Sequence, residues 1–347
     1  MNFASDNAYG AVPEILAALS RANDGAAAPY GEDSLTARVE ARLSEVFERD
    51  LAAFPVISGT AANALALAAI SPPYGAIFCH EESHIAVDEC GAPEFFSGGA
   101  KLVPLEGGGG KLTPQTIADA LPVYRRGVHS ALPAAISITQ ATELGTAYRP
   151  GEISALAELA HRGGMALHMD GARFANAVVH LGCTPAELTW KCGVDVLSFG
   201  ASKNGALCAE AVIFFNRDLV RDFEYRRKRG GHLLSKMRFV SAQLDAYLAE
   251  DRWLDNARLA NALAQRIADG LARIPGVKID IPVEANEVFA DVLAELAARL
   301  RDEGAVFYDW TTPANGRLVI RLVLSCLTPA DAVDGFLTVA RDHSVAV

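Results

Sequence analysis

Three polar groups follow apolar segments of the sequence, and together they could perform chemistry on a bound small molecule. Ser58, Gly59 and Thr60 precede an alanine-rich segment, Asp170 ends the segment MALHMD, and Lys203 follows DVLSFG among small residues. Free N–H groups at a helix start favour an anion, and a carboxylate that ends an apolar strand needs a partner or a function. Each feature alone has a simpler explanation: a helix cap for Ser58 and for Asp170, and a solvated side chain for Lys203.

As a set, the three groups match what pyridoxal 5′-phosphate (PLP) requires of a protein. This cofactor needs a lysine amine for a Schiff base, a carboxylate against its pyridine nitrogen, and an anion site for its phosphate. Lys203, Asp170 and the turn at residues 58–60 would supply these in that order. Space for a flat ring comes from the small residues around the lysine, which are Gly200, Ala201, Ser202 and Gly205. We therefore expect Lys203 to hold an aldehyde cofactor.

The elements that would position these groups alternate along the chain. Residues 34–47 and 152–164 have apolar spacing near 3.6 and predict helices. Short apolar segments predict strands at 133–140, 165–170, 194–200 and 209–216. Strands that alternate with helices indicate an α/β fold with a mostly parallel sheet covered by helices. Because ligands bind beyond the carboxyl ends of such strands, the three groups are expected at one edge of the sheet.

A smaller α+β unit is predicted at the C-terminal end. A helical pattern at 249–274 precedes two strand-like segments within 276–292, a helix at 294–304, and strands at 305–310 and 317–325. This order of elements is long enough for a compact domain of its own. We therefore expect a large domain at residues 1–245 and a small C-terminal domain at residues 246–347.

Composition and charge exclude several classes of function. The formal net charge of −11 argues against nucleic-acid binding, which needs a basic face. No apolar run reaches membrane-spanning length, and the N-terminal residues lack the layout of a signal peptide, so no membrane partner is expected. The six cysteines form no CxxC motif. They are expected to be free thiols of a cytoplasmic protein, and no metal site is predicted.

Longer motifs, in order along nearly the whole chain, resemble those of the low-specificity L-threonine aldolases. They are ASDN at 4–7, YGED at 30–33, SGTAAN at 58–63, HEESHIAVDECG at 80–91, HMDGAR at 168–173, FGASKNG at 199–205, RRKRGGHLLSK at 226–236 and RLVIRLV at 317–323. HMDGAR followed by SKNG at this separation is specific, whereas SGTAAN alone would be weak. The resemblance implies the aspartate-aminotransferase-like fold type I of PLP enzymes. It also implies a lyase that cleaves L-threonine or L-allo-threonine to glycine and an aldehyde.

The resemblance implies roles for individual residues around the cofactor. Lys203 would carry it, Asp170 would pair with its pyridine nitrogen, and the turn at 58–60 would hold its phosphate. His84 matches the histidine that stacks on the cofactor ring and takes part in proton transfer. From the sequence alone, a surface histidine in an acidic loop would be the preferred reading of His84.

A second set of residues would bind the substrate or complete the site from another subunit. The family's carboxylate-binding groups match Ser5, Arg173 and Arg321, and a bidentate arginine suits that task. Arg173 would also contact the cofactor, while Arg321 could instead lie on an exposed strand face. Segments that resemble those contributed across a dimer interface contain Tyr30 for the substrate, with Lys228 and Arg229 for the cofactor. We therefore expect a homodimer or homotetramer with active sites at the subunit interface and a small amino-acid substrate.

Three positions depart from the better-known members of this family. Glu143 in TQATELG stands where many have a histidine, Ser325 replaces a second histidine, and Ala4 stands where an arginine is common. These changes leave open which group handles the proton of the β-hydroxyl, and therefore the preferred side chain and diastereomer. The alternatives are a phenylserine-type aldolase, another PLP-dependent β-eliminating lyase or racemase, and a non-catalytic binding protein. The joint presence of Lys203, Asp170 and His84 argues against the last.

Overall fold

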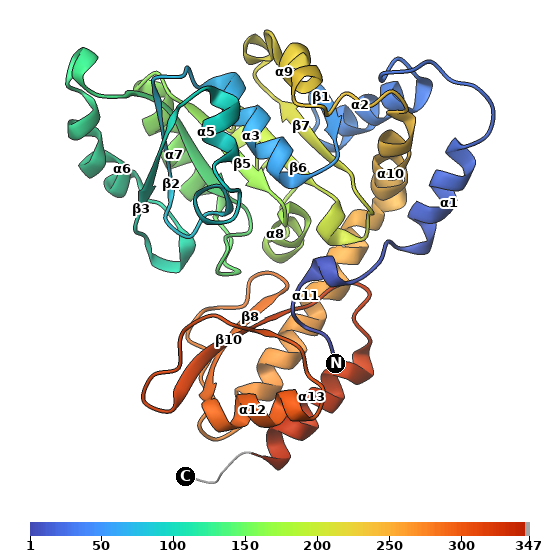
Figure 1. Ribbon diagram of the computed structural model, residues 1–347, viewed down its shortest axis with the longest axis vertical. Helices are drawn as coiled ribbons and strands as arrows, with labels where there is room; N and C mark the ends of the chain where they lie inside the picture. Colours follow the sequence, from blue (N-terminus) through green and yellow to red (C-terminus); the bar gives the residue numbers. More distant parts are fainter. Residues whose placement is uncertain (344–347) are drawn as a thin grey trace.

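The computed structural model describes residues 1–343, in which a large α/β unit stands above a smaller one (Figure 1). The large unit is built on a seven-stranded sheet in the order β1-β7-β6-β5-β4-β2-β3. Its strands are β1 (Ala52–Val56), β2 (Gly75–His80), β3 (Lys101–Leu105), β4 (Leu132–Thr139), β5 (Ala166–Gly171), β6 (Val196–Gly200) and β7 (Glu210–Phe214). Strand β7 runs antiparallel to both of its neighbours, and the other pairings are parallel. The predicted mostly parallel sheet is therefore confirmed, with one reversed strand.

Helices cover both faces of this sheet. Val196 packs with Leu65 and Ala66 of one helix, whereas its neighbour Leu197 belongs to a second core with Leu156. Successive residues of a strand point to opposite faces, so two separate cores form. The helices of the large unit are α1 (Pro13–Ala22), α2 (Ser34–Val46), α3 (Gly59–Ile70), α4 (His84–Val87), α5 (Ala92–Ser97), α6 (Pro114–Ala120), α7 (Pro150–Arg162), α8 (Phe174–Leu181), α9 (Phe223–Arg229) and α10 (Arg238–Leu248).

The smaller unit is an antiparallel sheet with helices on one face. Its strands, in the order β8-β10-β9, are β8 (Glu287–Leu293), β10 (Arg317–Val323) and β9 (Tyr308–Asp309). Its helices are α11 (Arg252–Leu271), α12 (Ala294–Asp302) and α13 (Ala330–Asp342). Val288, Ala290 and Val292 alternate into the helical core, so the intervening residues of β8 face the other way. In Figure 1, β8 and β10 lie between α12 and the large unit, and α11 runs beside them up to the large unit.

Two features tie the units together. Helix α11 contributes Trp253 to the core of the large unit and Ile267 to that of the smaller one. Near the other end of the chain, Phe3 is fully buried in the smaller unit's core, where its ring packs against Phe336. The strand expected at the start of 276–292 is reduced to one isolated bridge between Lys278 and Asp291. The division at residue 245 stays a prediction.

Candidate active site

A cavity of about 320 Å³ opens where β1, β5 and β6 end. Six residues expected at a site line it, namely Ser58, Gly59, Thr60, His84, Asp170 and Lys203. They come from segments far apart in the sequence, and the topology of the sheet brings them together at its carboxyl edge. The other lining residues are Asn7, Ile57, Asn63, Ala172, Ser202, Leu207, Cys208 and Glu210.

One wall of the cavity is the beginning of helix α3. The Ser58 side chain caps the helix by accepting a hydrogen bond from the Ala61 N–H, at 3.2 Å. The simple explanation for Ser58 as a helix cap therefore holds. Helix starts leave backbone N–H groups without intrahelical partners, and those of Gly59 and Thr60 belong to this first turn. The wall suits an anion such as a phosphate.

Asp170, the last residue but one of β5, is a buried carboxylate held in place on both oxygens. Oδ2 accepts a hydrogen bond from Asn63 at 2.7 Å, and Oδ1 accepts one from the Ala172 N–H at 3.0 Å. Two residues earlier, His168 is fully buried between the hydroxyls of Ser137 and Ser198. Burial lowers the pKa of His168 to about 4, so this imidazole is neutral. It therefore does not neutralise the negative charge of Asp170, which stays available to a positively charged ligand group.

His84 belongs to a hydrogen-bonded chain that leads to Asp170. Its Nδ1 lies 2.8 Å from Oε1 of Glu89, and the same oxygen accepts a hydrogen bond from Asn63 at 2.8 Å. The bond to Glu89 raises the pKa of His84 above its ordinary value against the opposing effect of burial. Burial in turn raises the pKa of Glu89. Glu89 and Asn63 are not among the residues that the sequence predicts for the site, although they lie in the motifs HEESHIAVDECG and SGTAAN.

Lys203 is carried by a turn that several buried groups fix. Glu210, at the start of the reversed strand β7, accepts hydrogen bonds from the N–H groups of Ala201 at 3.0 Å and Ser202 at 3.4 Å. Burial raises the pKa of Glu210 to about 7. Gly205 closes the turn with φ +103°, where a Cβ would meet Val12 and Asn256 at 2.9 Å. A residue other than glycine would therefore strain this turn.

The side chains around the cavity fit PLP. The amine of Lys203 suits the cofactor's aldehyde, the Asp170 carboxylate suits a pyridine nitrogen, and the start of α3 suits a phosphate. Asp170 is held by Asn63 and Ala172 in a fixed orientation, so its position does not depend on the ligand. The volume is also within the usual range for small-molecule sites.

The residues expected to bind a carboxylate lie outside the lining of this cavity. Arg173 is buried and donates from Nε and Nη2 to Asp6, at 2.9 and 3.3 Å, and its Nη1 lies 3.3 Å from Glu287. Arg321 lies over the rings of Tyr308 and Trp310.

Two further expected residues also stand apart from the cavity lining. Ser5 caps a short helical turn by accepting a hydrogen bond from Asn7. Glu143 is half-buried, and its charge contributes to the raised pKa values of Arg173 and Glu287.

The three residues expected from a neighbouring subunit lie apart from the cavity of their own chain. Lys228 Nζ is 4.4 Å from the centre of the Tyr30 ring, and Tyr30 is half-exposed. Arg229 lines a separate hollow next to Arg226 and the exposed ring of Phe95. Their positions leave them available to another molecule.

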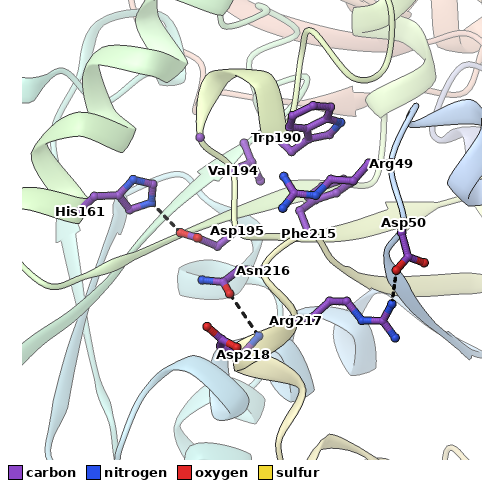
Figure 2. Close-up of a pocket in the computed structure, with 11 residues that line it drawn as sticks. Arg49, Asp50, His161, Trp190, Val194, Asp195, Phe215, Asn216, Arg217 and Asp218 are labelled. Carbon is purple, nitrogen blue, oxygen red and sulfur yellow. Dashed lines mark hydrogen bonds and ion pairs between the residues drawn. The ribbon is translucent and has the colours of Figure 1, made fainter.

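A second pocket, of about 470 Å³, lies at the opposite edge of the sheet (Figure 2). Two pairs of its side chains contact each other: His161 lies 2.9 Å from Asp195, and Arg217 pairs with Asp50. Arg49 lies over the ring of Trp190. None of the residues singled out from the sequence lines this pocket.

Metal-binding clusters and membrane-spanning helices are both absent from the part of the chain that the structure describes. Among residues 1–343, no group of three or more His, Cys, Asp or Glu side chains is placed to hold a metal ion. In the same range, no helix is long and apolar enough to cross a membrane.

Comparison with known proteins places this site in a family. The model of the β-eliminating lyase family matches residues 2–295. Two curated proteins named low specificity L-threonine aldolase, from a Pseudomonas species and from Pseudomonas aeruginosa, are each 47% identical over 91% of this chain and 91% of their own. A solved structure of Leishmania major threonine aldolase superposes with a TM-score of 0.93 at 26% identity, over 99% of both chains. This match confirms the expected fold type I. The chain therefore belongs to the β-eliminating lyase family, within its low-specificity L-threonine aldolases.

Proposed function

We propose that the protein is a PLP-dependent lyase that cleaves L-threonine and L-allo-threonine to glycine and acetaldehyde. The observation that carries the proposal is the convergence of Lys203, Asp170 and His84 on one cavity at the carboxyl edge of the sheet. Its support from outside the chain is 47% identity to curated low-specificity L-threonine aldolases. The phenylserine-type aldolase, the β-eliminating lyase and the racemase keep the same cofactor site and are separated by their products.

Each residue has a task in this reaction. Bound PLP would supply an electron sink for the electron pair left at Cα when the Cα–Cβ bond breaks. Lys203 would hold the cofactor covalently, Asp170 would keep a proton on its ring nitrogen, and α3 would hold its phosphate. His84 would accept the proton of the β-hydroxyl at Nε2, because its Nδ1 is engaged by Glu89.

Substrate orientation would depend on a second set of residues. Ser5, Arg173 and Arg321 would fix the α-carboxylate and hence the configuration at Cα. Lys228 and Arg229 of one subunit would reach the cofactor of another, and Tyr30 the substrate. Glu143 would assist at the β-carbon through a water molecule, in place of the histidine found in relatives.

The purified protein with PLP is expected to release glycine and aldehyde from both L-threonine and L-allo-threonine, and neither product from the D-isomers. A hydroxyl held by one imidazole should tolerate both β-configurations, whereas a site built around one hydroxyl position would reject the other strongly. The measurement is kcat/KM for each diastereomer and for phenylserine, with assays for glycine, pyruvate and ammonia. Pyruvate and ammonia as main products would instead identify a β-eliminating lyase. If Glu143→Gln leaves both kcat/KM values unchanged, Glu143 is a structural partner of Arg173.

If residues of two subunits complete each active site, a mixture of two inactive variants is expected to recover activity. We expect Lys203→Ala and Arg229→Ala to be impaired separately, and mixed dimers to regain activity because one site per dimer then holds both native residues. The measurement is turnover after subunit exchange, which is verified by mass spectrometry of differently labelled subunits. Exchange without recovery would show that each chain completes its own site.

Removing the Glu89 charge should move the acid limb of the pH–rate profile to lower pH. A histidine that accepts a proton must be neutral, and Glu89 raises the pKa of His84. Activity therefore falls as the pH drops through this raised pKa, and Glu89→Gln lowers that pKa. The profile of kcat/KM for Glu89→Gln is compared with that of Glu81→Gln, which changes an exposed neighbour. An acid limb that stays in place in Glu89→Gln would assign the proton transfer to another group.

A further inference from the structure

Glu287 is a buried carboxylate that the reaction described above does not use. It begins β8, opposite Val323 of β10, and Arg321 stands opposite Phe289. Side chains two residues apart on a strand share a face, so Glu287 and Arg321 are diagonal neighbours. This face of the small sheet is turned away from its helical core and toward the large unit (Figure 1). Glu287 is therefore close to both arginines assigned to the substrate carboxylate: it is a diagonal neighbour of Arg321, and it pairs with Arg173.

Arg173 already faces two carboxylates of its own chain, one hydrogen-bonded and one only in ion-pair contact. Asp6 occupies the Nε–Nη2 edge of its guanidinium, and Glu287 Oε2 lies 3.3 Å from Nη1. Each edge of a guanidinium binds one carboxylate. Because Asp6 occupies the Nε–Nη2 edge, a substrate carboxylate could bind Arg173 only on the Nη1 side, which faces Glu287. The side chains of Asp6, Arg173 and Glu287 are each at least 95% buried, which keeps water from screening this contact.

The cluster as a whole has more acids than bases and leaves polar atoms unsatisfied. Its charged members are Asp6, Glu143 and Glu287 against Arg173 and Arg321. Among the described residues, neither carboxylate oxygen of Glu287 nor Nε of Arg321 has a hydrogen-bond partner, although all three atoms are buried. Buried polar atoms without hydrogen-bond partners are costly. These three atoms would gain partners if a ligand or a proton bound in the cluster.

We infer that Glu287 sets the affinity of the site for the substrate, because its carboxylate occupies on Arg173 the place that the α-carboxylate of an amino acid must take. The inference rests on the proposed function, in which Arg173 and Arg321 bind that carboxylate. On binding, the substrate carboxylate replaces Glu287 at Nη1 of Arg173. Glu287 then takes up one proton from the solvent, so that the number of carboxylate charges in the cluster is unchanged.

The pH dependence of this exchange follows from the surroundings of Glu287. Burial raises its pKa to about 7, with Arg173 and Arg321 working in the opposite direction and Glu143 and Asp6 adding to the rise. Below that pKa, Glu287 is neutral and does not compete for Arg173. Above it, Glu287 is charged and competes, so KM rises with pH. One pH unit above the pKa only about a tenth of the sites have Glu287 protonated, so KM is about tenfold higher.

The test compares KM and kcat for L-threonine between pH 6 and pH 9 in the PLP-loaded wild type, Glu287→Gln and Asp291→Asn. We expect KM of the wild type to rise about tenfold for each pH unit above 7, and KM of Glu287→Gln to stay near the acid limit of the wild type, with kcat unchanged. Asp291→Asn should follow the wild type, because Asp291 pairs with Arg317 on the same sheet. A KM of Glu287→Gln that is higher at every pH, or that rises as in the wild type, would overturn the inference.

A second measurement does not need the glutamine variant to fold. Calorimetry of glycine binding in buffers of different ionisation enthalpy counts protons, and the wild type is expected to take up more at pH 8 than at pH 6. Glu287→Asp, whose shorter side chain retreats from Arg173, should reduce both this uptake and KM at pH 8. Equal uptake at the two pH values, or a higher KM in Glu287→Asp, would count against the inference. Both experiments presuppose that the enzyme makes glycine, so failure of the proposed function would appear as no turnover in the wild type.

Discussion

Lys203→Ala is expected to lose both the covalently held cofactor and at least about three orders of magnitude of turnover, as is usual when a covalent catalytic group is removed. The wild type mixed with PLP should be yellow, and borohydride should fix the cofactor to Lys203. The turn at residues 202–204 is held at both ends. The Ser202 N–H donates to Glu210, and the Asn204 side chain donates to the Tyr247 hydroxyl and to the Trp253 carbonyl oxygen. The shorter side chain should therefore leave the fold intact.

The measurement combines the visible spectrum, peptide mapping after borohydride reduction, and turnover of L-threonine. Lys191→Ala is the matched control, because Lys191 pairs with Glu48 at the far edge of the sheet and should keep colour and activity. The same borohydride-stable adduct in Lys203→Ala would disprove the assignment of the cofactor lysine. A normal melting temperature of the variant without PLP separates loss of attachment from loss of folding.

Asp170→Asn is expected to weaken PLP binding and to lower kcat by about 10²-fold or more, the scale of losing one key electrostatic group. A neutral amide cannot hold a proton on the pyridine nitrogen as a carboxylate does. In the wild type, the Asn63 side chain donates a hydrogen bond to Asp170. In the variant, the new amide would place its NH2 group against this donor. Within residues 1–343, the buried carbonyl oxygen of Asn63 has no hydrogen-bond partner, so the amide can turn to accept the new N–H group. That rotation would break its bond to Glu89.

Turnover, PLP affinity and the pH profile should be measured together for this variant. Loss of the Asn63–Glu89 bond predicts a change in the acid limb that is set by His84, in addition to the loss of kcat. Asp218→Asn, in the pocket of Figure 2, should leave all three quantities unchanged. Turnover within about twofold of the wild type in Asp170→Asn would remove Asp170 from the proposed electron sink.

The cofactor site was accessible from the sequence because its parts are local. Ser58, Asp170 and Lys203 each follow an apolar strand segment, and the rule that ligands gather at the carboxyl edge places them together. The same reasoning could not find Glu210. Its contact with the turn of Lys203 depends on β7 running antiparallel beside β6, and an apolar strand pattern carries no direction.

The carboxylates that contact Arg173 could not be predicted from the sequence, for a related reason. Asp6, Arg173 and Glu287 come from the N-terminal segment, the large unit and the small unit, and only their packing makes them neighbours. The motif HMDGAR predicts a substrate role for Arg173 but carries no sign of Asp6 and Glu287, which the fold brings to its guanidinium. Glu89 and Asn63 are a different case: both lie in motifs that resemble the family, but the spacing of residues along the chain does not indicate that they bond to each other.

The burial of Phe3 against Phe336 has a consequence for the order in which the protein can be completed. A chain leaves the ribosome from its N-terminus, so Phe3 emerges first and must wait for Phe336, close to the opposite end of the chain. The seven-stranded sheet can form during synthesis, because its strands end at Phe214. The smaller core cannot, since it lacks its last helix until α13 emerges. Burial of Phe3 must therefore wait until α13 has been synthesised, whereas Asp6 and Arg173 both precede the last strand of the large sheet and can pair earlier.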